Sequence, residues 1–227
     1  MSVTENLARV RERIDQACQR AGRNPREITL VAVTKGVGAD RVVEAHSLGV
    51  SHFGENRVQE AQQKIAALRH LDAAWHMVGH LQSNKAKLAV GLFHTIDSVD
   101  SLSLAEALSR RAPVSLPILL EVNVSGEASK FGISPLSLPR AFEEIARLPN
   151  LEVRGLMTVA PLVKDLQEVR PLFARLRELA RALGLKALSM GMSDDFEAAV
   201  EEGATEVRLG RAIFGEGPGD VVWGDLP

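Results

Sequence analysis

Short apolar runs alternate with amphipathic stretches along almost the whole chain. The first amphipathic stretch covers residues 3–21, where Leu7, Val10 and Ile14 recur at helical spacing and share one face. Glycine is a frequent C-cap because it adopts the left-handed conformation at little cost, so Gly22 marks the end of this predicted helix. The pattern therefore predicts one leading helix that buries a single apolar face.

Beyond residue 22, each of eight apolar runs leads into a helical pattern. This alternation is typical of a parallel sheet whose strands are joined by helices. Eight such units favour a closed barrel over an open doubly wound sheet. We predict an α/β fold, a single (β/α)8 barrel of the TIM type that spans residues 1–227 and carries the extra N-terminal helix. The predicted strands cover residues 28–34, 51–54, 74–79, 92–96, 117–124, 151–158, 187–190 and 206–209. The predicted helices cover residues 40–48, 58–68, 84–90, 102–110, 138–148, 166–183 and 196–202, with one short helix after the last strand.

The composition is that of an ordinary globular protein. Of 227 residues, 45% are hydrophobic and 25% are charged, and the net charge is −2, so no nucleic-acid partner is expected. The apolar runs are too short to cross a bilayer, and the charged N-terminal segment lacks the apolar core of a secretory signal. The chain has one cysteine, Cys18, which excludes a disulfide framework. We therefore expect a protein of the reducing cytoplasm that has no membrane contact.

Polar residues gather where the predicted strands end. In a (β/α)8 barrel, functional side chains stand at the carboxyl ends of the strands, on one face of the barrel. Strand ends are polar in many proteins, so this pattern indicates a functional face without identifying its chemistry. The residues in these positions are Lys35, Glu55, Asn56, His80, Gln82, Asn84, Asp97, Ser98, Asn123, Met157, Thr158, Ser193, Arg208 and Gly210.

The lysine at the first strand end is the most informative of these residues. Lys35 follows the apolar run LVAVT at positions 30–34. A lysine at the mouth of a barrel is expected to be partly desolvated, and desolvation lowers an amine pKa. The neutral amine can then attack an aldehyde and form a Schiff base. A lysine that simply points into solvent fits the spacing equally well.

The last two strand ends carry a second signal. Phosphate sites in such barrels use the loops after strands seven and eight, together with a helix N-terminus. The first loop is GMSDDF (191–196), where Ser193 is placed to cap the next helix, and the second begins with RLGRAIFG (208–215), where Gly210 permits close backbone approach to an anion. Ordinary capping and a plain turn explain the same residues, and the two acids of the first loop oppose an anion unless they face away.

Two histidines were considered as metal ligands. His76 and His80 lie four residues apart, which places both on one face of a strand. No third ligand is evident in the sequence, so we predict no metal site. The chain also contains no tyrosine, which excludes any mechanism that needs a tyrosine from the same chain as acid or base.

Seven segments carry motifs whose order and spacing agree with those of one known family. They are AVTKG (32–36), HFGENRVQE (52–60), WHMVGHLQSNK (75–85), HTIDSVDS (94–101), EVNVSGEASKFGI (121–133), RGLMTV (154–159) and SMGMSDDFEAAVEEGATEVRLGRAIFG (189–215). Together they closely resemble the pyridoxal phosphate homeostasis proteins of the YggS/PROSC type. The resemblance implies the fold of the N-terminal barrel domain of alanine racemase, without the second, β-rich domain.

The resemblance also implies where pyridoxal 5′-phosphate would lie. Lys35 would hold the cofactor as a Schiff base, Asn56 would lie beside its ring, and Arg208 would face its pyridine nitrogen. Further pocket positions are implied for Met192, His80 and Asn123.

The phosphate group would lie on the last two loops. The resemblance implies that Ser193, Gly210 and the backbone of Arg211 bind it. Many relatives have Tyr where this chain has Arg57, which leaves that contact open, and some have Thr in place of Arg211. The second difference matters less, because a backbone N–H binds phosphate whichever side chain it carries.

The chemistry of these residues favours holding the cofactor over turning over a substrate. Arginine stays protonated, so Arg208 would disfavour a protonated pyridine, and an unprotonated pyridine is a poorer electron sink. Racemisation also needs bases on both faces of the substrate Cα, and Lys35 could serve only one face. We therefore expect a cofactor buffer that delivers pyridoxal phosphate to apo-enzymes, with little or no catalysis.

Two enzymatic readings stay open from the sequence. One is a slow pyridoxal phosphate-dependent amino-acid racemase or a related enzyme, and the other is a cofactor-free Schiff-base aldolase on the same barrel. Without the second domain, the chain lacks the partner surface of alanine racemase, and we therefore expect a monomer.

Overall fold

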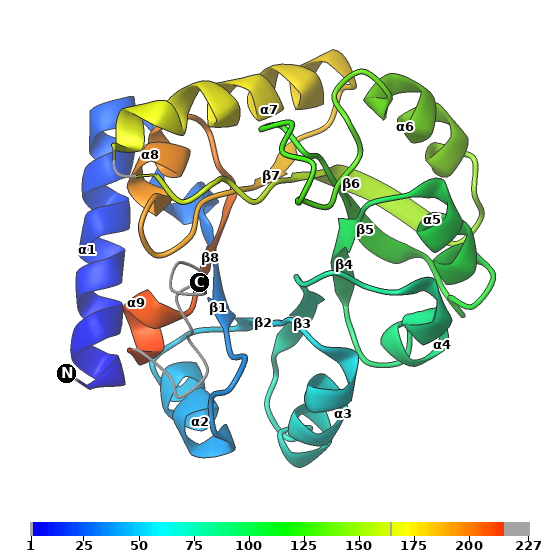
Figure 1. Ribbon diagram of the computed structural model, residues 1–227. Coiled ribbons are helices and arrows are strands. Elements are labelled where there is room, and N and C mark those ends of the chain that lie inside the picture. Colours follow the sequence, from blue (N-terminus) through cyan, green and yellow to red (C-terminus); the bar gives the residue numbers. More distant parts are fainter. Residues whose placement is uncertain (1, 164, 216–227) are drawn as a thin grey trace, which may run out of the picture.

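The computed structural model describes residues 2–163 and 165–215, and these residues form one closed parallel barrel (Figure 1). The strands follow one another around the barrel in chain order, and the last strand closes it by pairing with the first. The predicted (β/α)8 barrel is thereby confirmed. The strands are β1 (Thr29–Val33), β2 (His52–Glu55), β3 (Ala74–Met77), β4 (Thr95–Val99), β5 (Leu116–Glu121), β6 (Leu151–Met157), β7 (Ala187–Ser189) and β8 (Glu206–Leu209).

Helices surround the barrel and join its strands (Figure 1). Each predicted helix is present, and 3-10 turns at Ser83–Lys85 and Leu166–Glu168 precede α4 and α7, where the prediction joined turn and helix. The helices are α1 (Val3–Ala21), α2 (Ala39–Ser47), α3 (Val58–Ala67), α4 (Ala86–Ala89), α5 (Leu102–Ser109), α6 (Leu138–Ala146), α7 (Arg170–Ala182), α8 (Phe196–Glu201) and α9 (Arg211–Phe214).

The position of the fourth strand differs from the prediction. The prediction placed it at residues 92–96, but β4 begins three residues later. Phe93 turns back onto α4 instead, with its backbone N–H donating to Ala89 O at 3.0 Å. Asp97 and Ser98, which were expected to follow the strand, lie inside it and are both 0% exposed. The prediction took these polar residues to mark the end of the strand, but the barrel interior holds polar side chains at this level.

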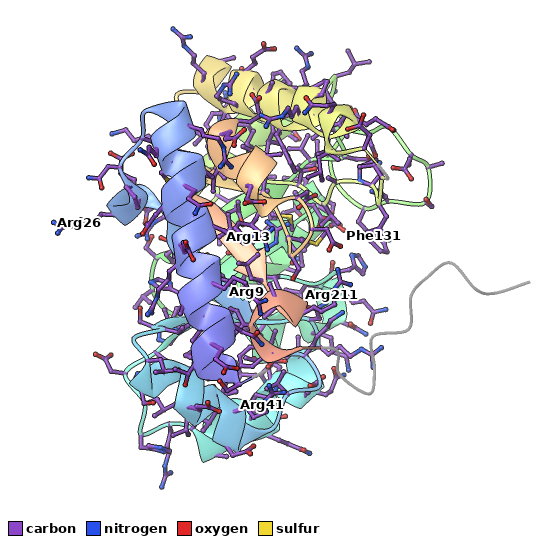
Figure 2. The ribbon with its side chains drawn as sticks, turned by 90° about the vertical axis from the view of Figure 1, so that its left-hand side faces the viewer. Arg9, Arg13, Arg26, Arg41, Phe131 and Arg211 are labelled. Atoms are coloured by element: carbon purple, nitrogen blue, oxygen red, sulfur yellow. The ribbon has the colours of Figure 1, made fainter. Side chains whose placement is uncertain are left out.

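The extra helix α1 lies across the outside of the barrel (Figure 2). A capping box between Ser2 and Glu5 begins it, and Gly22 ends it in the left-handed conformation with φ 64°. Its buried face packs against α2, α8 and α9. The Asn6 side-chain amide is buried and donates to Ile213 O at 2.9 Å. Helix α1 therefore fixes the two elements that follow β7 and β8.

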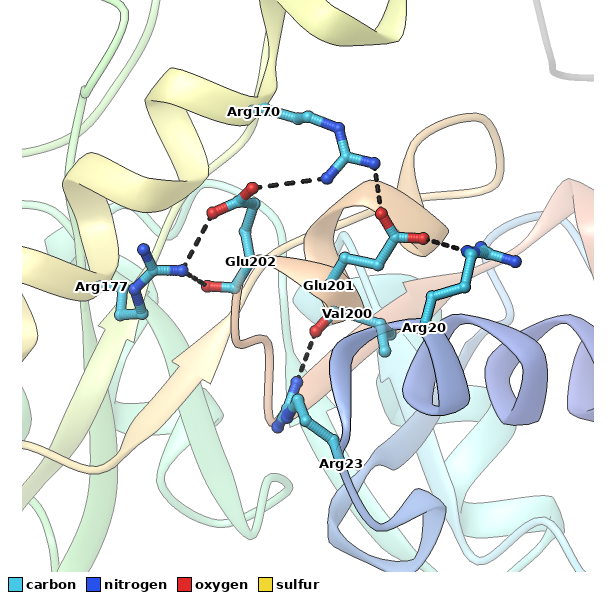
Figure 3. Close-up of polar contacts among 7 residues, drawn as sticks. All are labelled: Arg20, Arg23, Arg170, Arg177, Val200, Glu201 and Glu202. Carbon is cyan, nitrogen blue, oxygen red and sulfur yellow. Dashed lines mark hydrogen bonds and ion pairs between the residues drawn. The ribbon is translucent and has the colours of Figure 1, made fainter.

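Ion pairs hold α8 from two sides (Figure 3). The Glu201 carboxylate accepts from Arg20 of α1 at 2.5 Å and also from Arg170 of α7. The next residue, Glu202, accepts from Arg177 of α7 at 2.9 Å and pairs with Arg170 at 3.4 Å. A charged network between partly buried groups is more stabilising than an isolated surface pair. The C-terminal end of α8 is therefore held by α1 and α7.

Burial is not confined to apolar residues. Apolar side chains fill the space between the strands and the surrounding helices, while the barrel interior also holds buried charged residues. Among the buried polar residues are Glu55, His76, Asp97, Glu121 and Arg208. A search of the described residues found no helix that combines the length and the apolar character needed to traverse a bilayer.

Candidate functional site

The order of the strands brings three of the predicted site residues to neighbouring positions. Strand β1 pairs with β2 on one side and with β8 on the other, so Lys35 lies between the strand ends that carry Asn56 and Gly210. The backbone of Gly210 runs close to β1, because a Cβ atom there would lie 3.3 Å from Val33 O. Because Gly210 has no side chain, space remains beside Val33, which lies two residues before Lys35.

Lys35 itself is exposed in the structure. The predicted partial desolvation of this side chain was therefore wrong, because Lys35 stands two residues beyond the end of β1 rather than inside the barrel mouth.

A buried ion pair supports the backbone beneath Lys35. Lys64 of α3 donates to Glu55 Oε1 at 2.6 Å and also to the backbone oxygen of Thr34, whose hydroxyl donates to Glu55 Oε1 at 2.5 Å. Burial raises the pKa of Glu55, and the bonds from Lys64 and Thr34 oppose that rise. Sequence analysis missed Lys64, because an amphipathic helix pattern does not show which polar residue turns toward the strands.

Two buried oxygen atoms beside Lys35 lack partners. Neither Asn56 Oδ1 nor Glu55 Oε2 has a hydrogen-bond partner among the described residues. Unsatisfied buried polar atoms are rare in folded proteins and point to a bound group that completes them. A buried amide oxygen without a partner, next to an exposed lysine, suits the binding of a polar ring such as that of pyridoxal phosphate.

A hydrogen bond links the loop after β7 to the helix that follows β8. The Ser193 hydroxyl accepts from the backbone N–H of Ala212 in α9 at 3.1 Å. The prediction that Ser193 caps α8 was therefore wrong, since the N-cap of α8 is Asp195 and its side chain accepts from Met192 N at 2.6 Å instead. The closure of this loop onto itself prevents Asp195 from reaching the first turn of α8.

The acids of the first loop are both engaged. Asp194 pairs with Arg211 at 2.6 Å, so each neutralises the other beside the predicted phosphate site. Burial raises the pKa of Asp195, while its bond from Met192 N opposes that rise. The objection that two acids would repel a phosphate is weakened, because one is paired and the other faces its own loop.

Close packing restricts one glycine of the same loop. Gly191 has φ +93°, and a Cβ atom there would lie 2.5 Å from the Ala199 Cβ. Any other residue would push this loop away from α8, so the shape of the loop depends on glycine at this position.

Arg208 is buried in the barrel interior and held at a fixed position. Its guanidinium donates to Ser189 Oγ at 2.8 Å and to Thr158 O at 2.7 Å. Burial lowers the pKa of Arg208, while four carboxyl groups oppose that effect, namely Asp97, Glu121, Asp195 and Glu206. An arginine this well surrounded keeps its charge. Ser189 was not foreseen, because a serine inside a short apolar strand gave no signal.

Two of the predicted pocket residues lie in other surroundings. His80 Nδ1 pairs with Asp100 at 3.0 Å, and the His80 ring stacks on Phe131 with centroids 3.8 Å apart. Both rings line a cavity of about 540 Å³ that also contains Lys130. Asn123 uses its side chain to hold its own loop, donating to Glu127 O at 2.8 Å.

The two histidines considered as a pair point to different places. Strand β3 ends at Met77, so His80 belongs to the following loop, whereas His76 is buried and pairs with Asp97 at 3.0 Å. The assumption that both lie on one face of a strand was wrong.

Comparisons with known proteins show similarity over nearly the whole chain. The family model described as "Alanine racemase, N-terminal domain" matches residues 6–218. A pyridoxal phosphate homeostasis protein of Pseudomonas aeruginosa is 48% identical over 219 residues, which cover 94% of this chain and 95% of that protein. One from Aquifex aeolicus is 44% identical over 95% of this chain and 99% of its own length. The structure of PipY from Synechococcus elongatus, solved with pyridoxal phosphate bound, has a TM-score of 0.82 at 39% identity, covering 94% of this chain and 100% of that chain.

Proposed function

The chain belongs to the family of pyridoxal phosphate homeostasis proteins, and we propose that it holds pyridoxal 5′-phosphate as a Schiff base on Lys35 and buffers its supply in the cell. The observation that carries this proposal is the similarity over nearly the whole chain to PipY with its bound cofactor. The orphaned Asn56 oxygen beside the exposed Lys35 supports it independently.

Each residue has a part in the proposed site. Lys35 binds the aldehyde, Asn56 lies against the ring, and Arg208 faces the pyridine nitrogen. Ser193 and the backbone of Gly210 and Arg211 bind the phosphate, and Met192 and His80 line the pocket. For His80 the proposal requires the ligand to reach the cavity beside Phe131, because that is where its ring lies.

The proposed role is cofactor supply with little or no catalysis. When bound, pyridoxal phosphate serves as an electron sink for amino-acid chemistry, and a protonated pyridine nitrogen makes it effective. The buried charge of Arg208 opposes that protonation. The chain has no tyrosine to act as a second base, and its curated relatives carry the name of homeostasis proteins.

We further propose that residues 1–227 act as one domain, as a monomer in the cytoplasm, and that apo-forms of pyridoxal phosphate enzymes receive the cofactor. In the part of the chain that the structure describes, the closed barrel leaves no sheet edge for a partner chain to extend, which removes one route to association.

Reductive trapping tests the Schiff base directly. The protein is incubated with pyridoxal phosphate, reduced with borohydride, digested and examined by mass spectrometry. We expect the reduced adduct on the peptide that contains Lys35, at near one adduct per chain. Lys87→Ala, which removes an exposed lysine from α4, is the matched control and should label as the wild type does. An adduct spread over many lysines, or one that survives unchanged in Lys35→Ala, contradicts the proposal.

A further inference from the structure

A second polar cluster lies inside the barrel, away from the strand ends that carry the proposed cofactor site. His76 of β3, Asp97 of β4 and Glu206 of β8 each present one donor atom, and these atoms all lie within 4.8 Å of one another. His76 is 5% exposed and Asp97 is 0% exposed. Because β8 is not a neighbour of β3 or β4 in the sheet, the three side chains meet across the barrel interior.

The spacing and the donor types suit a transition-metal ion. Zn²⁺ binds imidazole nitrogen and carboxylate oxygen at about 2.0–2.2 Å, which puts tetrahedral ligand atoms about 3.4 Å apart. His76 Nδ1 and Asp97 Oδ2 are already 3.0 Å apart. The Glu206 donor atom lies within 4.8 Å of both, so its carboxylate would complete three ligands, with a fourth position for water.

One ligand atom has nothing else to bind. Glu206 Oε2 is buried and has no hydrogen-bond partner among the described residues. A buried carboxylate oxygen without a donor costs free energy, which a cation would remove.

The outer contacts of the cluster match those of known metal sites. A ligating histidine usually gives its other ring N–H to an acceptor, and ligating carboxylates are hydrogen-bonded in turn. His76 Nε2 lies 2.9 Å from His52 Nδ1, and the Thr95 hydroxyl donates to Asp97 Oδ1 at 2.9 Å.

An opening near the cluster also favours a cation. His52 also lines a cavity of about 360 Å³ at the amino end of the barrel, together with Thr29 and residues of α1. The cavity therefore reaches His52, whose ring contacts His76 of the cluster.

We infer that His76, Asp97 and Glu206 form a binding site for one Zn²⁺ ion inside the barrel, with His52 and Thr95 as its outer partners. The site is separate from Lys35 and predicts that the protein binds a metal in addition to its cofactor.

Binding of ZnCl2 alone tests the site. Equilibrium dialysis of the protein as purified, in a buffer without phosphate, should give one Zn²⁺ per chain. Glu206→Gln keeps the shape of the side chain and should weaken binding about tenfold or more. His70→Asn removes an exposed histidine and is the matched control, with binding expected to equal that of the wild type. X-ray absorption at the zinc edge should show only nitrogen and oxygen neighbours.

Several results of these measurements would contradict the proposed zinc site. No stoichiometric binding, or equal binding by the wild type and by both Glu206→Gln and Asp97→Asn, overturns the inference. A sulfur neighbour would place the ion on Cys18 and would overturn it too. Because Glu206→Gln alters one buried oxygen that has no partner, a thermal unfolding transition like that of the wild type should confirm that this variant folds.

Discussion

The hydroxyl of Ser193 accepts a hydrogen bond from the backbone N–H of Ala212 at 3.1 Å, and this contact joins the loops after β7 and β8. The two segments are therefore held together although the bonded residues lie 19 positions apart in the chain. Helix α1 contacts the helices that follow both loops: Asn6 donates to Ile213 O, and Arg20 pairs with Glu201.

The first prediction concerns this contact. Ser193→Ala removes the hydroxyl that joins the loops and faces the proposed phosphate. Loss of a hydrogen bond to a charged group costs about 1.5–3 kcal/mol, so affinity for pyridoxal phosphate should fall about 10- to 100-fold. Binding of pyridoxal, which has no phosphate, should change little. Ser115→Ala, at an exposed position, is the control. An equal loss for both ligands would mean that Ser193 acts only on the fold.

A second prediction concerns the network in Figure 3. Burial tends to raise the pKa of Glu201, but its bonds from Arg170 and Arg20 outweigh this and hold it below its usual value. A lowered carboxyl pKa stabilises the fold above the unfolded value of 4.5, and this stability is lost as pH falls through the folded pKa. Glu201→Gln should therefore lower the free energy of unfolding by about 1 kcal/mol at pH 7, after allowance for solvent screening.

Urea unfolding of Glu201→Gln at pH 7 and at pH 3.5 measures this effect, and the difference from the wild type should shrink at the lower pH. Glu178→Gln is the matched control, because Glu178 and its partner Arg175 are both largely exposed and 3.6 Å apart. A constant difference at both pH values would show that charge pairing is not the cause.

A third prediction concerns a buried acid in β5. Burial and the charge of Asp100 raise the pKa of Glu121 to about 7, although Arg208 opposes the rise. The protonated form of Glu121 is the form that burial favours. Its contribution to the stability of the fold is therefore complete below pH 4.5, the ordinary pKa of a glutamate, and is lost as the pH rises through the folded pKa of about 7. Ionisation of Glu121 then opposes folding by up to about 3 kcal/mol.

Glu121→Gln should consequently be more stable than the wild type at pH 8, with a much smaller difference at pH 4.5. Chemical unfolding at the two pH values measures this. Glu127→Gln, at an exposed position in the following loop, should show no such pH dependence. A variant that is less stable than the wild type at pH 8 would indicate that Arg208 needs the Glu121 charge.

A fourth prediction separates cofactor supply from catalysis. Exchange of the Cα proton of alanine and other amino acids in heavy water, followed by proton NMR, should be far slower than turnover by ordinary enzymes, whose kcat values are about 1–1,000 per second. Arg208→Gln removes the charge beside the proposed pyridine nitrogen and should increase exchange. Fast exchange by the wild type would favour a racemase.

The fold could be predicted well because its signal is local. Apolar runs of strand length between amphipathic helices repeat eight times, and each repeat is visible without its partners. The prediction failed at β4, where Asp97 and Ser98 are polar yet buried. Polarity at a strand end and polarity inside a barrel look the same in sequence.

The site was predicted unevenly for a similar reason. Lys35, Asn56 and Gly210 follow strands and could be found by position, and the barrel places their strands side by side. Lys64 lies nine residues from Glu55, but the pattern of its helix does not show that it turns toward the strands. His76, Asp97 and Glu206 come from strands β3, β4 and β8, and Glu206 is far from the other two in the chain. Only the closed barrel brings such residues together, so no spacing in the sequence reveals them.

The visible absorbance spectrum of the purified protein tests the central claim most directly. On addition of pyridoxal phosphate, the wild type should develop the absorbance band of a Schiff base, saturating at one cofactor per chain, and an added amino acid should shift it only slowly. Lys35→Ala should lack this band, while Lys87→Ala keeps it. An unchanged band in Lys35→Ala would contradict the account.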